Sequence, residues 1–178
     1  MKNVCLIIFL FFSSLVTALS EEIYLRCIPE ITQVRAGDFK KGQILAHRIL
    51  YAKFAEEYDL TKSEKPTKVL KELKTYLTNY KGKKDKFSFE NLEYRETDKT
   101  KSFNFEDLYE TKKFRSFFTM NINYDGGSWV SSGNLDISEL KKGKLNKSNF
   151  SWYGDCFSLT KKQFKKPLGN EDFYNSVK

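Results

Sequence analysis

Histidine is almost absent from this chain, whose 178 residues contain only His47. A zinc site needs more ligands than one histidine and two cysteines can supply, so we predict no metal and no cofactor. A hydrolase triad would need His47 as its base. The nearest approach to a nucleophile motif, GGSWV at 126–130, lacks its second glycine and lies in a predicted hairpin. We therefore predict no catalytic residue of these kinds and interpret His47 as structural.

Long apolar runs are also scarce, and the one present lies at the N-terminus. Val4 to Val16 follows Lys2 and precedes Ala18-Leu19-Ser20, which is the pattern of a secretory signal cleaved after Ser20. The run is shorter than the roughly 20 apolar residues of a membrane-spanning helix. We predict that residues 1–20 are a signal peptide and that the protein is exported, to a periplasmic or extracellular location, without a transmembrane helix in its mature chain.

Cysteine is scarce as well, and removal of the signal peptide would reduce the number of cysteines. Of the three cysteines, Cys5 lies in the signal segment, so Cys27 and Cys156 remain. Two thiols in an oxidising compartment normally pair. Strand alternation places Cys27 with Ile23 and Leu25, and Cys156 with Phe150 and Trp152, on apolar faces. We predict a Cys27–Cys156 disulfide closing a loop of about 130 residues, which the chain-entropy account values at about 4.8 kcal/mol.

Positive charge is in excess, but arginine is rare. The formal net charge of +8 comes almost entirely from lysine clusters at 81–86, 141–144 and 161–166. Such clusters are typical of a solvated surface, and they also attract anionic surfaces. Because the protein is predicted to leave the cytoplasm, nucleic acid is not an expected partner. The partners left open are an anionic surface, a glycan or a small amphipathic ligand.

Proline is limited to three residues, and aromatic residues make up 16% of the chain. A mature chain of about 160 residues fits one domain with one core. We assign that domain to residues 21–166 and interpret residues 167–178 as a loose tail. The predicted fold class is α+β and mainly antiparallel β, either a meander sheet or a small barrel or sandwich. One or two amphipathic helices are expected to pack on it.

The segment from Lys86 to Leu159 carries the β signal. Phe118, Met120 and Ile122 alternate with polar residues, and 125–127 (DGG) supplies the positive φ angles of a tight hairpin. Trp129 should return on the Ile122 side. FSFENLEY at 87–94 is echoed by FNFEDLYE at 103–110, which indicates neighbouring strands. We predict an antiparallel meander in this segment, with its last strand at 149–159. The first strand of the domain is predicted separately, at 22–28.

Two earlier segments are less uniform. The apolar residues of Lys68 to Tyr80 recur at helical spacing, after Pro66 and before Gly82, so we predict an amphipathic helix covering the sheet. Residues 34–42 are expected to form a turn-rich connection. Residues 43–58 fit helix and strand equally well, and both remain open.

Three short motifs carry a resemblance. They are YLRC at 24–27, INYDGG at 122–127 and GDC at 154–156. The chain resembles small, uncharacterised exported bacterial proteins with an N-terminal Y-x-x-C strand, an I-N-x-x-x-G turn and a terminal G-x-C. Tyr124 departs from that pattern, in which an arginine is expected. The resemblance implies a compact β domain with a terminal disulfide and brings no activity with it.

The predicted function is that of a non-enzymatic binding or envelope-associated domain. Tyr153, Trp129 and Trp152 are the candidate ligand-binding residues, and Tyr153 is the best exposed of them by strand parity. The alternative is a secreted hydrolase that uses carboxylates, for which Glu90 and Glu106 occupy matching places in the echoed strands. Whether apolar or acidic residues converge in a pocket distinguishes these two readings.

Overall fold

The computed structural model describes residues 20–57, 67–89 and 91–178. The predicted signal peptide therefore lies almost wholly outside the described residues. The described strands are β1 (Glu22–Cys27), β2 (Glu30–Ala36), β3 (His47–Glu57), β4 (Thr67–Thr78), β5 (Lys84–Phe87), β6 (Asn91–Glu96), β7 (Thr100–Glu110), β8 (Phe114–Asp125), β9 (Ser128–Lys141) and β10 (Lys144–Ser158). They are followed by two short helices, α1 (Lys161–Lys165) and α2 (Asn170–Val177).

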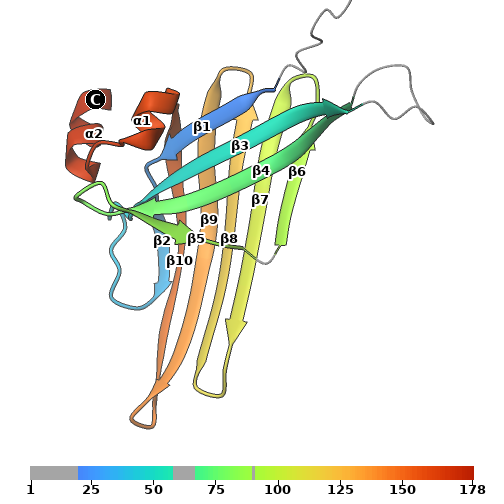
Figure 1. Cartoon of the computed structure of the whole chain (residues 1–178). Coiled ribbons are helices and arrows are strands. Elements are labelled where there is room, and N and C mark those ends of the chain that lie inside the picture. Colours follow the sequence, from blue (N-terminus) through green and yellow to red (C-terminus); the bar gives the residue numbers. More distant parts are fainter. Residues whose placement is uncertain (1–19, 58–66, 90) are drawn as a thin grey trace, which may run out of the picture.

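In the described part of the chain, all ten strands belong to one antiparallel sheet. Its order is β5-β4-β3-β1-β10-β9-β8-β7-β6, and β2 pairs with β10 farther along the edge that β1 occupies. The edge strands β5 and β6 are consecutive in the chain, so a link of a few residues joins the two edges and the sheet must curl. Figure 1 shows β1, β3 and β4 crossing over the long strands β7 to β10. The predicted class, mainly antiparallel β with packed helices, is confirmed.

The meander from β6 to β10 is confirmed in its details. β8 and β9 meet in a two-residue hairpin loop, with Asp125 paired to Ser128 and Gly126 at φ +59°. Trp129 pairs with Tyr124 and returns on the Ile122 side. The echoed segments supply the neighbouring strands β6 and β7. Periodicity of two was a reliable signal here because one face of each strand is buried.

The helix predicted for Lys68 to Tyr80 is wrong, because this segment forms β4. The cause is a β-bulge: Lys53 pairs with Glu72, but the next residue, Phe54, pairs with Leu70 and leaves Lys71 as an extra residue. Leu70 and Leu73 therefore both pack against the core although they are three residues apart. A bulge changes the spacing from two to three, and that spacing imitates a helix.

Two other N-terminal segments are also strands. Within the open segment 43–58, residues 47–57 form β3, which pairs with β1 and β4, while Tyr58 lies outside the described residues. The turn-rich connection expected at 34–42 begins later than predicted, because β2 continues to Ala36. Pro29 separates β1 from β2, since proline cannot donate a ladder hydrogen bond, and the two strands lie end to end along β10.

The inner face of the curled sheet holds an aromatic core. Phe54, Phe103 and Phe105 are at most 1% exposed there, together with Met120 and Ile122. Gly133 makes room for Trp152: a Cβ on Gly133 would lie 2.5 Å from the indole ring. The position is thus restricted to glycine by close packing.

The disulfide between Cys27 and Cys156 lies at the edge of this core. The two cysteines are direct partners across β1 and β10 and are separated by 129 positions in sequence. The bridge therefore joins the first and last strands of the chain, β1 and β10, which are neighbours in the sheet. This pairing confirms the prediction made from strand parity.

The outer face is covered in part by the two helices (Figure 1). Phe164 of α1 contacts the rings of Tyr24 and Tyr51, with centroids 5.0 and 5.6 Å away. Phe173 of α2 is only 4% exposed and packs beside Ile28 and Leu159. Residues 167–178 were expected to form a loose tail, but they contain α2, whose Phe173 packs against the sheet.

Candidate ligand-binding site

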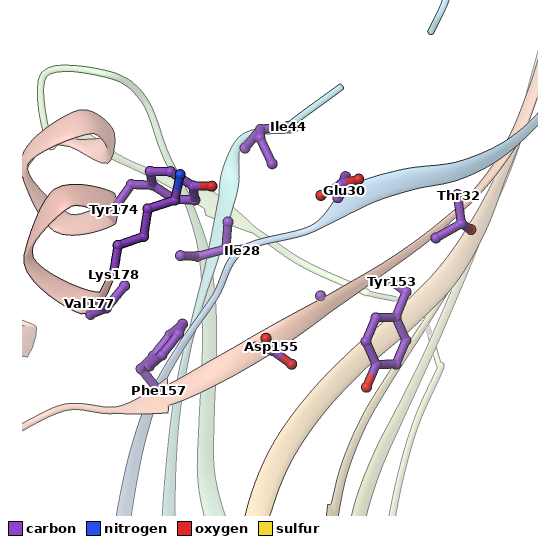
Figure 2. Close-up of a pocket in the computed structure, with 11 residues that line it drawn as sticks. Ile28, Glu30, Thr32, Ile44, Tyr153, Asp155, Phe157, Tyr174, Val177 and Lys178 are labelled. Atoms are coloured by element: carbon purple, nitrogen blue, oxygen red, sulfur yellow. The ribbon is translucent and has the colours of Figure 1, made fainter. Parts of the chain in front are cut away.

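A cavity of about 370 Å³ opens on the outer face, between β2, β10 and the last turn of α2. Tyr153, Asp155 and Phe157 point outward together because they alternate along β10. Two walls complete the cavity, and in Figure 2 Phe157 lies on the side of α2 while Tyr153 lies on the side far from it. One wall comes from the β1–β2 segment and the loop after it, the other from α2; their side chains are Ile28, Glu30, Thr32, Ile44, Tyr174, Val177 and Lys178. The volume lies in the range of small-ligand sites, about 300–1,000 Å³.

Gly154 allows the close approach that forms one side of this cavity. A Cβ at Gly154 would lie 2.0 Å from the carbonyl oxygen of Ile28. The backbone N–H of Ile28 donates to the Asp155 carbonyl oxygen at 3.0 Å, so the segment leaving β1 packs directly against β10. The glycine of the G-x-C motif thus has a packing role, and its cysteine forms the disulfide.

The opposite wall depends on how α2 is held. Arg26 of β1 is fully buried, and its guanidinium donates to the carbonyl oxygen of Leu168 at 2.8 Å and to Oδ1 of Asn170 at 2.7 Å. The guanidinium also lies 4.2 Å from the ring centroid of Phe173. No described carboxylate forms an ion pair with Arg26, and burial lowers its pKa to about 10. A charged side chain at this position therefore fastens the C-terminal segment through hydrogen bonds and a cation–π contact.

His47 completes that anchor. Its Nδ1 accepts a hydrogen bond from Nε of Arg26 at 3.0 Å, and the side chain is 1% exposed. Burial and, second, the nearby Arg26 cation lower the pKa of His47 to about 4. The imidazole is consequently neutral at physiological pH and has no access to a ligand, as expected for a structural histidine.

The cavity combines an apolar lining with groups that attract cations. Glu30 and Asp155 bring carboxylates to its rim, and Ile28, Ile44 and Phe157 supply apolar surface. The ammonium of Lys178 already lies 3.9 Å from the ring centroid of Tyr174. The last turn of α2 adds the negative end of its dipole. These features suit an amphipathic ligand with a positively charged head.

The three aromatic residues predicted as ligand contacts do not form one surface. Trp152 is 2% exposed and stacks on Phe118 in the inner core. Trp129 is partly buried against the same core and lines an adjoining cavity of about 710 Å³ beside α1 and α2, which shares Asp155, Phe157 and Val177 with the outer cavity. Of the three, Tyr153 alone lines the outer cavity, and its 46% exposure makes it available to a ligand.

The carboxylate pair considered for hydrolysis is not placed by the structure, because Glu90 lies outside the described residues. Glu106 is exposed on the outer side of β7, beside Asn91 and Glu93 in an open polar depression. Among residues 20–57, 67–89 and 91–178, no group of three or more His, Cys, Asp or Glu residues could hold a metal ion.

Several residues of the outer cavity escaped sequence analysis. Asp155 could have been found, since it shares strand parity with Tyr153. Glu30 and Ile44 could not, because they meet through an isolated bridge between β2 and the following loop. Tyr174 and Lys178 belong to a segment whose docking depends on Arg26, more than 140 positions away.

Comparison with protein-family models and with curated proteins finds no match to this chain.

Proposed function

We propose that this protein is an exported, non-enzymatic binding module. Its ligand is a small amphipathic molecule with an apolar body and a cationic head, held in the outer cavity. The signal-like N-terminus and the Cys27–Cys156 disulfide support export, because disulfides persist in oxidising compartments. In the described part of the chain, no helix is both long and apolar enough to cross a membrane.

One observation supports the choice of ligand: an ammonium group of the protein already makes a cation–π contact with an aromatic ring at the cavity. Lys178 lies over Tyr174, in a cavity also lined by Glu30 and Asp155. A ligand cation that displaces the Lys178 ammonium would meet the same ring and both carboxylates, while its apolar body covers Ile28, Ile44 and Phe157. The basic surface by itself would favour an anionic head, whereas the residues of the cavity favour the opposite sign.

Calorimetric titration with three octyl compounds tests this proposal, since they share a tail and differ in the head. Octyltrimethylammonium should bind with a dissociation constant on the order of 0.1–1 mM, as expected for a ligand of that size. Octanoate and octyl glucoside should bind at least about tenfold more weakly, a difference of about 1.4 kcal/mol. The glucoside also tests the glycan alternative.

Two variants and a matched control sharpen the titration. Glu30→Gln and Asp155→Asn should each weaken binding of the ammonium compound without strengthening the binding of octanoate. Glu106→Gln removes an exposed carboxylate outside the cavity and should leave binding unchanged. Equal affinity for all three head groups, or equal effects of all three substitutions, would refute the proposed ligand class.

A further inference from the structure

Two neighbouring hairpin ends project from the end of the sheet opposite the helices. The β7–β8 turn (residues 111–113) and the β9–β10 turn (residues 142–143) extend beyond β1, β3 and β4 in Figure 1. They lie side by side, because the backbone N–H of Leu140 donates to the carbonyl oxygen of Lys113 at 2.7 Å. We call residues 110–117 and 138–147 the hairpin tips.

The hairpin tips are strongly basic. They contain seven lysine or arginine residues and two glutamates, an excess that is large beside the net charge of +8 for the whole chain. The seven are Lys112, Lys113, Arg115, Lys141, Lys142, Lys144 and Lys147. Their side chains make no ion pair with any described carboxylate. The positive charge is therefore available to an external anion.

Exposed apolar side chains accompany this charge. Leu140 and Leu145 are cross-strand partners at the end of the β9–β10 ribbon and are 45% and 58% exposed. Leu108 and Phe117 are partners across β7 and β8 and are also exposed. Strand parity places all four on the outer face, with Arg115 and Lys147 in the row between the two pairs.

This arrangement has no folding role that explains it. Beyond Glu139, the last β9 residue paired with β8, the β9–β10 ribbon is two-stranded, so Leu140 and Leu145 can contact each other but face no third layer. A cross-strand pair contributes only about 0.2–1 kcal/mol. Exposed leucines flanked by lysines are the composition that binds the interface of an anionic bilayer, where apolar side chains enter the headgroup region and lysines meet lipid phosphates.

We propose that the hairpin tips dock the protein on an anionic phospholipid surface. This inference does not depend on the proposed ligand. Docking through the tips leaves the outer cavity accessible, since α2 lies at the opposite end of the molecule (Figure 1).

Vesicle co-sedimentation tests the charge requirement. The protein should bind vesicles containing phosphatidylglycerol and not pure phosphatidylcholine, and added salt should weaken binding. The triple variant Lys141→Gln/Lys142→Gln/Lys144→Gln should bind about 100-fold more weakly, since each lysine near such a surface contributes about fivefold. The matched control Lys162→Gln/Lys165→Gln/Lys166→Gln removes equal charge at α1 and should bind normally.

A second pair of variants separates a bilayer from a soluble polyanion. Leu140→Ser/Leu145→Ser should weaken vesicle binding at least about tenfold while leaving retention on heparin unchanged. The control Leu92→Ser/Leu168→Ser removes two exposed leucines elsewhere and should bind vesicles normally. The proposal is overturned if the protein ignores anionic vesicles. It is equally overturned if the tip leucines prove dispensable, because the tips would then bind polyanions through charge alone.

Discussion

The two faces of β1 are both buried, but by different means. Leu25 and Cys27 point inward to an aromatic core shared by most strands of the sheet. Arg26 points outward and is buried by the segment around α2, through hydrogen bonds to Leu168 and Asn170. Inward burial is apolar and spread over many residues, whereas outward burial combines the hydrogen bonds of Arg26 with a smaller apolar cluster around Phe173. We therefore expect disruption of inner-face contacts to unfold the whole sheet. Disruption of the outer-face contacts should release α2 alone.

The disulfide should have the largest effect on the inner side. Reduction should lower the free energy of unfolding by about 5 kcal/mol, because the bridge closes a loop of 129 positions. Urea unfolding with and without reductant, followed by circular dichroism, measures this difference. Two reactive thiols in unreduced protein would contradict the pairing.

A matched pair of phenylalanines compares the faces directly. Phe105 of the inner core and Phe173 of α2 are 1% and 4% exposed. Phe105→Ala should destabilise the whole sheet by about 4 kcal/mol through the cavity it leaves. Phe173→Ala should expose only residues near 168–178 to hydrogen exchange, because few contacts hold that segment. Equal loss of protection across all strands in both variants would show that the faces are one cooperative unit.

The smallest expected effect depends on pH and belongs to the outer face. His47 has a folded-state pKa of about 4, below its ordinary 6.5. Between these two pH values its imidazole is therefore protonated in the unfolded chain and neutral in the folded chain. Stability should therefore fall as pH drops from about 6.5 to about 4, by about 3 kcal/mol in total. His47→Gln should remove this part of the pH dependence, measured as the difference between the two proteins' urea midpoints. Parallel pH profiles would refute the assignment of a neutral, buried imidazole.

The sequence predicted the inner face well and the outer face poorly, for a physical reason. Inner-face residues such as Phe118, Met120 and Ile122 follow strand periodicity, which is local in sequence. The β4 bulge at Lys71 broke that periodicity and led to a wrong helix. The outer site is assembled by contacts between distant segments, such as Arg26 with Asn170, that leave no local pattern.

The candidate site shows the same difference between residues that local periodicity identifies and residues that only distant contacts bring together. Tyr153 was identified because its parity opposes that of Trp152, while both tryptophans were assigned to ligand binding although they pack in or against the core. A large aromatic residue at inward parity contributes most to a core. Tyr174 lay in the segment interpreted as a loose C-terminal tail, so its place at the cavity became visible only with the docking of α2.

The central claim is that the outer cavity between β10 and α2 is the ligand site, and an NMR titration tests it most directly. Octyltrimethylammonium added to ¹⁵N-labelled protein should shift the backbone amides of Glu30, Thr32, Tyr153 and Tyr174, which line the outer cavity and not the adjoining one. The indole N–H of Trp129 and the amides of the hairpin tips should not move. Shifts centred on Trp129 would place the site in the adjoining cavity, and a saturating titration that leaves Glu30, Thr32 and Tyr153 unmoved would contradict the account.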